Sequence, residues 1–453
     1  MLNSPGSSGI DPLRPHFAAE AAAIEQHYRH ATPASAALMQ RAAGAMPGGN
    51  TRTTNFYPPY PIVIERGEGP WVWDVDGRRY VDLFCNGLSL IHGNAYRPAR
   101  EAIQAAMQRG TAWAGASREQ VAYAELLQGR LRGLESLRFT NSGSEAGMLA
   151  VKAARHVTGR PYIIKMAGAY HGSYPDLEAG LYGQGDIAGR TLVAQFNDLG
   201  SFERIMARHG DQIAGIVVEP VLVTGRVAAP APGFLAGLQQ LARRHGALFI
   251  LDDCLMLRLA VGGSAEKFDL QPDLFVLGKF LGGGTPFGAF GGASHLMRIF
   301  DPTRPGCVFH GGSFNGNVLG CAAGLVTLRD LTAGRIAEMD AASLQIRTAL
   351  VARAQALGIE AVITGLGSVT GIAFAADPKR HEDDPSALGV ASLFHLACIA
   401  EGVLLGPGGI IAVSTAHDST AVAHAIGGLT AALERVAYLL RGADQPQVSI
   451  PSQ

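Results

Sequence analysis

Cysteine is scarce in this sequence, and its few copies lie far apart. Only five of the 453 residues are cysteine, namely Cys85, Cys254, Cys307, Cys321 and Cys398, and no two of them form a Cys-x-x-Cys pair. Disulfide-stapled domains and structural zinc sites need closely spaced cysteine or histidine ligands. The sequence therefore argues against both, and we expect no metal site.

Charge and long apolar runs are also in short supply. Charged residues make up 17% of the chain, and 37 Lys and Arg nearly balance 38 Asp and Glu. This balance gives no basis for binding nucleic acid or a membrane surface. A run of about 18 apolar residues, which a transmembrane helix needs, is missing, as is the basic-then-apolar start of a signal peptide. We expect a cytoplasmic protein with neither partner.

Apolar residues and glycine are abundant instead. The apolar share is 47%, and 58 residues are glycine, about twice the ordinary share of roughly 7%. A high apolar share excludes disorder, and many glycines indicate many tight turns. The length allows two or three domains of about 150 residues each.

The two ends of the chain have a different pattern of predicted helices and strands from its middle. Residues 17–46 have helical spacing and predict a helix that Pro47 ends. Residues 61–84 predict short strands, with Asp76-Gly77 as a hairpin turn. After about residue 330 the pattern predicts a helix, then the apolar stretch GIEAVITGLGSVTGIAFA, a helix over 385–402, a strand-like stretch and a last helix over 418–441.

Between these ends, short apolar runs alternate with helical stretches. Such runs are typical of strands buried on both faces of a mainly parallel sheet. The sequence thus predicts an α/β fold with a large domain and a smaller α+β domain. We expect an N-terminal segment over 1–85 that joins the small domain, a large domain over 86–330, and a C-terminal small domain over 331–453.

Three of the predicted buried strands end on an ionisable side chain. The run 213–218 is followed by Glu219, the run 247–251 by Asp252, and the run 274–277 by Gly278 and Lys279. The carboxyl edge of such a sheet is where ligands bind. One residue of this kind is explained as well by being the first solvated residue after its strand. Three in series favour a ligand site.

A turn of small residues precedes a strong helical pattern upstream. Asn141, Ser142, Gly143 and Ser144 follow a short strand-like run, and an Ala-rich helical stretch begins after them. A helix N-terminus offers free backbone N–H groups that suit a phosphate. Ser144 beside Glu145 could equally be an ordinary N-cap. A lysine, an aspartate and a phosphate cradle are together the parts that bind pyridoxal phosphate.

The sequence resembles the fold-type I, class III pyridoxal-phosphate aminotransferases of the glutamate-1-semialdehyde aminomutase type. Within that group its pattern is most similar to the β-amino acid (β-phenylalanine) aminotransferases. The segments that carry the resemblance are PGGNTR (47–52), WDVDGRRYVD (73–82), FTNSGSEA (139–146), YHG (170–172), VVEP (217–220), LDDC (251–254), LGKFLGGGTPFGAFGG (277–292) and HGGSFNGN (310–317). The resemblance implies a seven-stranded, mainly parallel sheet in the large domain and pyridoxal 5'-phosphate as the cofactor.

The resemblance assigns roles to the residues that match. Lys279 matches the lysine that forms a Schiff base with the cofactor and then moves protons, and Asp252 matches the partner of the pyridine nitrogen. Tyr170 matches the aromatic residue that stacks on the ring. The expected cofactor-binding residues are Ser142, Gly143, Ser144, Tyr170, His171, Glu219, Asp252, Lys279 and Ser313.

Ser313 matches a residue that reaches the phosphate across a subunit interface. The resemblance therefore implies a homodimer with shared active sites. Arg258 is interpreted as a supporting residue paired with Asp253.

Substrate recognition is where the chain departs from the pattern. Arg52 matches the arginine that holds the substrate carboxylate in β-amino acid aminotransferases, although a surface arginine in a polar loop would look the same. Those enzymes carry a second arginine in a Pro-Arg-Gly segment, where this chain has Pro407, Gly408 and Gly409.

Several activities agree with these residues. The leading hypothesis is an aminotransferase that moves the amino group of a β-amino acid or related amine to a keto acid. The alternatives are a 2,1-aminomutase, which the missing arginine favours, and a lyase or decarboxylase on the same scaffold. A scaffold that binds the cofactor without turnover is disfavoured, because Lys279, Asp252 and Tyr170 are all present.

Overall fold

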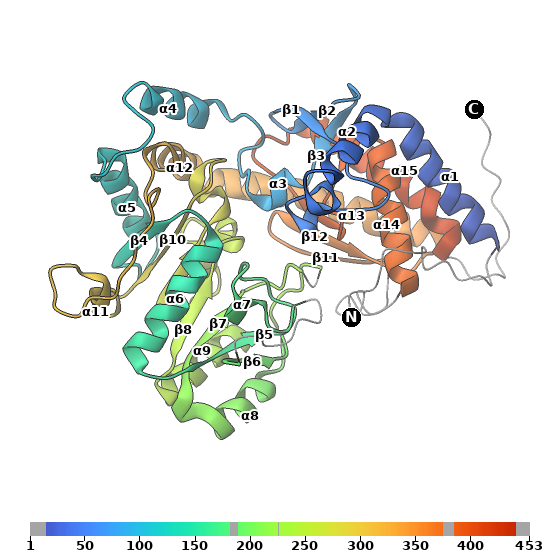
Figure 1. Ribbon diagram of the computed structural model, residues 1–453. Coiled ribbons are helices and arrows are strands. Elements are labelled where there is room, and N and C mark those ends of the chain that lie inside the picture. Colours follow the sequence, from blue (N-terminus) through green and yellow to red (C-terminus); the bar gives the residue numbers. More distant parts are fainter. Residues whose placement is uncertain (1–14, 182–188, 225, 375–384, 441–453) are drawn as a thin grey trace.

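Three β-sheets and the helices around them make up the described part of the chain. The computed structural model describes residues 15–181, 189–224, 226–374 and 385–440 (Figure 1). Its largest sheet has seven strands in the order β4-β10-β9-β8-β7-β5-β6. These strands are β4 (Ser136–Thr140), β5 (Tyr162–Met166), β6 (Thr191–Ala194), β7 (Ile213–Val218), β8 (Leu248–Asp252), β9 (Leu274–Leu277) and β10 (Gly288–Gly292). The predicted α/β fold is confirmed.

The seven-stranded sheet is mainly parallel. Strands β9, β8, β7, β5 and β6 pair in parallel, whereas β10 is antiparallel to both β4 and β9. Parallel pairing puts the carboxyl ends of β7, β8 and β9 at one edge of the sheet. That edge is the place where ligands bind in open α/β sheets.

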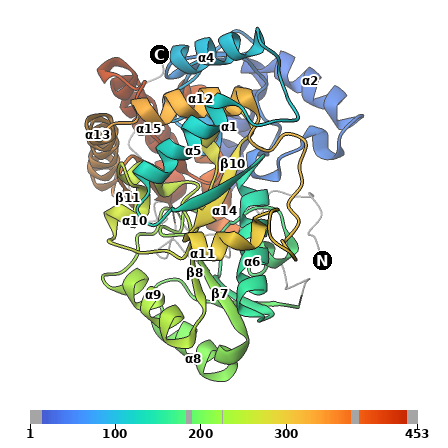
Figure 2. The same cartoon turned by 90° about the vertical axis from the view of Figure 1, so that its left-hand side faces the viewer.

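Both faces of this sheet are covered by helices, which explains its unbroken apolar runs. Along β8, Phe249 and Leu251 belong to one buried cluster and Ile250 to another. Helix α6 (Gly143–Thr158) packs on the face of Ile250, and α8 (Leu199–His209) and α9 (Phe234–His245) pack on the opposite face (Figure 2). Because each side chain faces a buried layer, strand periodicity is hidden in the sequence.

Further helices surround the large sheet. Helix α12 packs against both α4 and α5. The other elements between residues 85 and 330 are α3 (Cys85–Leu88), α4 (Arg97–Met107), α5 (Arg118–Arg130), α7 (Pro175–Glu178), α10 (Gly263–Lys267), α11 (Ser294–Met297) and α12 (Val318–Asp330). Within the described residues, no helix combines the length and the apolar character that crossing a membrane requires.

There are two small sheets, with the strand orders β1-β2-β3-β13 and β11-β12-β14, and the first of them joins N-terminal to C-terminal strands. Strand β13 pairs in parallel with β3, and the antiparallel β2–β3 hairpin turns at Asp76-Gly77 as predicted. The elements are β1 (Ile64–Glu68), β2 (Trp71–Asp74), β3 (Arg79–Asp82), β11 (Val362–Leu366), β12 (Val369–Ala373), β13 (Val403–Leu404), β14 (Ile410–Ala412), α1 (Pro15–Ala31), α2 (Pro33–Ala43), α13 (Ala333–Leu357), α14 (Pro385–Ala400) and α15 (Ser419–Leu440). These contacts support the predicted domain division, which stays a prediction.

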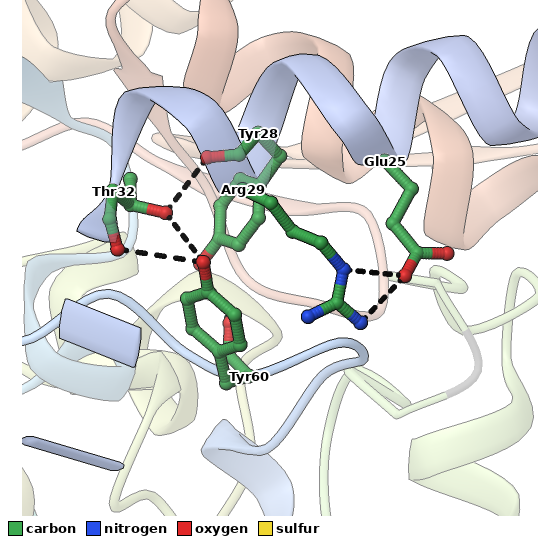
Figure 3. A network of polar contacts seen from close by, with 5 residues as sticks. All are labelled: Glu25, Tyr28, Arg29, Thr32 and Tyr60. Atoms are coloured by element: carbon green, nitrogen blue, oxygen red, sulfur yellow. Dashed lines mark hydrogen bonds and ion pairs between the residues drawn. The ribbon is translucent and has the colours of Figure 1, made fainter. Parts of the chain in front are cut away.

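The N-terminal helix differs from its prediction because it is broken at Thr32. Proline lacks an N–H and restricts the residue before it, so Thr32 before Pro33 leaves the helix with φ −132°. The Thr32 hydroxyl instead contacts the Tyr28 carbonyl oxygen and the Tyr60 hydroxyl, at 2.8 and 3.1 Å (Figure 3). The Tyr28 hydroxyl donates to the Tyr60 carbonyl oxygen at 2.6 Å. These bonds fasten α1 to the segment before β1.

Candidate active site

The three ionisable residues at the strand ends gather at one edge of the sheet. Glu219 directly follows β7, Asp252 is the last residue of β8, and Lys279 comes two residues after β9. Glu219 and Asp252 are buried, with 3% and 6% of their surfaces exposed. The simpler explanation, a first solvated residue after the strand, is therefore wrong for both carboxylates. Lys279 has a φ of +54°, a left-handed conformation that is rare for a residue other than glycine.

Asp252 is held in its ionised form by its neighbours. Its Oδ2 lies 2.8 Å from His171 Nδ1, and its Oδ1 accepts a hydrogen bond from the Cys254 backbone N–H at 3.1 Å. Burial alone would raise the pKa of Asp252, but the bonds from His171 and Cys254 hold it below its ordinary value. The strand end therefore presents a buried negative charge at neutral pH.

Glu219 has the opposite protonation tendency. Burial, together with the charge of Asp252, raises the pKa of Glu219 to about 8, although Lys279 opposes this shift. Its Oε1 accepts a bond from the Val223 backbone N–H at 3.4 Å, and its Oε2 has no hydrogen-bond partner among the described residues. At neutral pH Glu219 is mostly protonated, so it can donate a hydrogen bond rather than add a second negative charge.

The small-residue turn forms the N-terminus of α6. Ser142 is the N-cap, and its hydroxyl accepts a bond from the Glu145 backbone N–H at 3.1 Å. The suggestion that Ser144 is the cap is wrong, because its hydroxyl instead accepts a bond from the Ser173 backbone N–H at 3.2 Å. The N–H groups of Gly143 and Ser144 occupy the first two helical positions and have no acceptor within the helix. They form an anion-binding end.

This helix end lies against the lysine-bearing loop. A Cβ at Gly278 would lie 3.0 Å from the Gly143 Cα and 3.1 Å from the Cys254 Sγ. Only residues without a side chain allow two backbones to approach this closely. The phosphate-type turn, the end of β8 and the loop before Lys279 therefore meet at one place.

The chemistry of this cluster fits pyridoxal phosphate. The α6 end suits the phosphate, the Asp252 carboxylate suits a cationic ring nitrogen, and Lys279 supplies an amine for the aldehyde. The buried atoms His171 Nε2 and Glu219 Oε2 lack partners among the described residues, as expected of groups that await a polar ligand.

Tyr170 and Ser313 are positioned differently from this cluster. Tyr170 directly precedes His171 and is 36% exposed. Ser313 lies on an exposed segment, where Asn315 Oδ1 accepts a bond from Asn141 Nδ2 at 3.0 Å. The segment thus reaches the residue next to the α6 cap. The stacking role of Tyr170 and the phosphate role of Ser313 stay predictions.

Arg52 makes its side-chain hydrogen bond with a residue outside the lysine cluster. It is exposed, and its Nη1 donates to Asn86 Oδ1 at 2.6 Å. No hydrogen bond or ion pair joins Arg52 to Lys279 or Asp252 within the described ranges. The Asn86 turn, with a φ of +50°, is a neighbour that the sequence gave no reason to expect.

The interpretation of Arg258 is wrong. Its Nε donates to Ser368 Oγ at 2.8 Å, and its Nη2 donates to the Val413 carbonyl oxygen. Asp253 instead accepts a bond from the Ser264 backbone N–H at 3.0 Å. Arg258 therefore joins the segment after β8 to the residues that adjoin β12 and β14, rather than supporting the strand-end acids.

One residue that the sequence reasoning missed supports the Tyr170–His171 loop. Lys165 on β5 is fully buried, and its Nζ donates to the carbonyl oxygens of Ala169 and Ala179 at 2.9 and 2.6 Å. Burial lowers the pKa of Lys165 to about 8, against the influence of Glu219 and Glu178. The sequence feature that could have drawn attention to Lys165 is a single lysine within an apolar strand.

Comparison with known proteins agrees with this geometry. Residues 53–176 and 190–436 match the family described as Aminotransferase class-III. The β-phenylalanine transaminase of Variovorax paradoxus is 36% identical over 403 residues, covering 86% of this chain and 90% of that protein. The glutamate-1-semialdehyde 2,1-aminomutase of Myxococcus xanthus is also 36% identical, over 417 residues, covering 86% of this chain and 96% of that protein.

A solved structure extends the likeness to the fold. It is described as a transaminase with PLP bound and superposes with a TM-score of 0.85 at 32% identity, covering 91% of this chain and 99% of that one. The family match spans well over half of the sequence. The chain belongs to the class-III aminotransferases, a family of enzymes that depend on pyridoxal phosphate.

Proposed function

We propose that this enzyme moves the amino group of a β-amino acid or related amine to a keto acid. The observation that carries the proposal is the cluster of Lys279, Asp252 and Glu219 beside the N-terminus of α6. Similarity to a β-phenylalanine transaminase supports the choice of β-amino acids. Arg52 supports it further, because a guanidinium fork binds a carboxylate through two hydrogen bonds.

Different residues of the cluster would hold different parts of the cofactor. Pyridoxal phosphate, when bound, supplies an aldehyde that condenses with amines and a ring that takes up electrons. The N–H groups of Gly143 and Ser144 would hold the phosphate, and Ser142 caps this helix end. The Asp252 carboxylate, which is bonded to His171, would pair with the ring nitrogen, and Tyr170 would stack on the ring.

Proton movement is the task of Lys279 and Glu219. Lys279 Nζ takes the proton from the amine-bearing carbon of the substrate and returns a proton at the end of the transfer. Glu219 is mostly protonated at neutral pH because burial raises its pKa to about 8, so its carboxyl group can donate a hydrogen bond to a bound ligand. Because Glu219 is then neutral, it adds no second negative charge to that of Asp252 at the ring.

We infer that two copies of the chain form the working unit. The segment around Ser313 carries Phe309 and Phe314, whose surfaces are 81% and 59% exposed. Large apolar side chains exposed on one short segment are typical of an interaction surface. In a dimer, Ser313 would reach the phosphate of the other copy. Light scattering of the wild type and of the Phe314→Asp variant tests this, and a monomeric wild type would contradict it.

An aminomutase is the second candidate. Gly408 stands where the resembling enzymes carry the arginine of a Pro-Arg-Gly segment, and an aminomutase needs no separate keto-acid acceptor. The likeness to a glutamate-1-semialdehyde 2,1-aminomutase supports this candidate as well. A lyase or decarboxylase on the same scaffold is a third outcome of the experiment below.

The experiment follows the cofactor absorbance and the products with one amino donor, with and without added keto acid. A transaminase consumes one equivalent of donor and stops until a keto acid is added. An aminomutase turns over without it, and a lyase or decarboxylase releases ammonia or carbon dioxide. Borohydride reduction followed by peptide mapping gives an independent check, because the adduct must lie on Lys279.

A further inference from the structure

Residues 169–173 form a strap that follows β5 and reaches both acids of the strand-end cluster. The Tyr170 backbone N–H faces the Glu219 carboxyl group and counters part of the rise in its pKa. His171 is buried, and its Nδ1 lies 2.8 Å from Asp252 Oδ2. Two successive residues of the strap therefore face the two carboxyl groups whose protonation states differ.

The far end of the strap lies on the turn that begins α6. The Ser173 N–H donates to Ser144 Oγ at 3.2 Å. A Cβ at Gly172, which has a φ of +106°, would lie 2.6 Å from the Ser144 Cα. Only a residue without a side chain can approach another backbone this closely. The strap therefore runs from the two acids to the N–H groups that suit a phosphate.

Lys165 on β5 holds the near end of the strap. Its Nζ donates to the Ala169 carbonyl oxygen at 2.9 Å and to the Ala179 carbonyl oxygen at 2.6 Å. The Ala169 carbonyl and the Tyr170 N–H belong to one planar peptide group. A bond at one end of this plane therefore also sets the direction of the other end, so the Lys165 amine orients the N–H that faces Glu219.

Packing alone does not account for a lysine at this position. Lys165 is fully buried, and a buried amine loses its hydration. Both of its partners are neutral carbonyl oxygens rather than carboxylates. Burial lowers the pKa of Lys165 to about 8, although Glu219 and Glu178 oppose this shift. A methionine would fill a similar volume without burying a polar group, so what the lysine adds is two directed hydrogen bonds.

We propose that Lys165 is a positioning residue that keeps the strap on Asp252 and on the N-terminus of α6 before pyridoxal phosphate binds. This inference rests on the proposed function, because it takes the strand-end cluster as the cofactor site. Lys165 acts through Tyr170 and His171, since its amine is bonded to the backbone at the start of the strap. A site whose parts are already in place loses less conformational freedom on binding, so loss of the anchor weakens cofactor binding.

The first measurement is a titration of the cofactor-free full chain with pyridoxal phosphate, followed by absorbance. Lys165→Met should raise the Kd of the cofactor by about 10- to 100-fold, the usual loss when a group that orients a ligand-binding residue is removed. The KM of the amino donor at saturating cofactor should change little. Tyr28→Phe is the matched control, because it removes another buried bond to a carbonyl oxygen, that of Tyr60. It should lower stability and leave the Kd unchanged.

A double-mutant cycle separates positioning from general support of the fold. In His171→Phe the bond to Asp252 is already lost, so adding Lys165→Met should raise the Kd of the cofactor much less than it does in the wild type. An unchanged Kd in Lys165→Met, or the same increase in both backgrounds, would overturn the inference. The proposed function would survive that result as long as the wild type still forms the adduct on Lys279 and transfers the amino group.

Hydrogen exchange of the wild type decides the matter if Lys165→Met does not fold. The backbone amides of the strap should already be protected in the cofactor-free wild type, nearly as well as in the cofactor-bound protein. A strap that gains protection only when the cofactor binds would overturn the inference, because the cofactor rather than Lys165 would then order it. A wild type that binds no pyridoxal phosphate at Lys279 would instead overturn the proposed function.

Discussion

The strand-end cluster and the surroundings of Arg52 are built in different ways. At the strand ends, the backbone of a parallel sheet positions Glu219 and Asp252, and both carboxyl groups are buried. Arg52 instead donates a hydrogen bond to Asn86, which lies in a turn and has a φ of +50°. In the proposed function, sheet topology would fix the groups for the chemistry, and turns, which change more readily, would fix the group for substrate selection.

The largest effect on activity is expected from removing the amine of Lys279 in the strand-end cluster. Lys279→Ala should lower kcat by about 10²- to 10⁴-fold, the usual contribution of a positioned proton-transfer group, and should abolish the borohydride adduct. Steady-state kinetics and peptide mapping measure both. Lys267→Ala, at an exposed lysine on α10, is the matched control. Wild-type turnover of the Lys279→Ala variant would contradict the proposed catalytic role of the strand-end cluster.

A second test removes the charge of Asp252 but keeps its shape. Asp252→Asn should lower kcat by about 10²- to 10³-fold, the cost of removing one preorganised electrostatic group. Its neighbour Asp253, which bonds to Ser264 and whose pKa burial raises to about 7, gives the control. Asp253→Asn should retain most of the activity, and equal losses in the two variants would contradict the different roles assigned to them.

The strand-end cluster could be predicted from sequence because its signals are local. An apolar run that stops at an acid or a lysine shows where the strand ends, and parallel pairing then collects these ends at one edge. The protonation states could not be predicted in this way. They depend on His171 reaching Asp252 across 81 positions of the chain, and on the burial of Glu219.

The surroundings of Arg52 could be predicted only in part. Arg52 was found by resemblance, but its partner Asn86 lies 34 positions away, and nothing local links them. The pairing of Arg258 with Asp253 failed for a similar reason, since proximity in sequence did not determine the contacts of a buried guanidinium.

A third test asks whether Arg52 binds the carboxylate of the amino donor. Arg52→Ala should raise the KM for β-amino acids by about 10- to 150-fold, corresponding to about 1.5–3 kcal/mol for a hydrogen bond to a charged group, with little change in kcat. Initial rates with a β-amino acid and with the matching amine that lacks the carboxylate measure the effect. Arg66→Ala, at an exposed arginine on β1, is the control. The same KM change for both donors would take Arg52 out of the site.

The smallest expected effect is a pH dependence of stability that arises at Glu219. Its pKa is raised to about 8 in the folded chain by burial and by Asp252, against about 4.3 when unfolded. Between these values the folded state holds one proton more than the unfolded state. Glu219 therefore weakens folding as pH rises, by about 1.4 kcal/mol per pH unit.

Glu219→Gln keeps the shape of the side chain and removes this titration. We expect the cofactor-free wild type to lose stability relative to the variant as pH rises from about 5.5 to about 7.5, by up to about 3 kcal/mol. Urea unfolding of both proteins across this range measures the difference. Parallel pH profiles would mean that Glu219 is ionised throughout. In that case the strand ends would carry two negative charges, and the neutral donor assigned to Glu219 would have to be abandoned while the role of Asp252 stands.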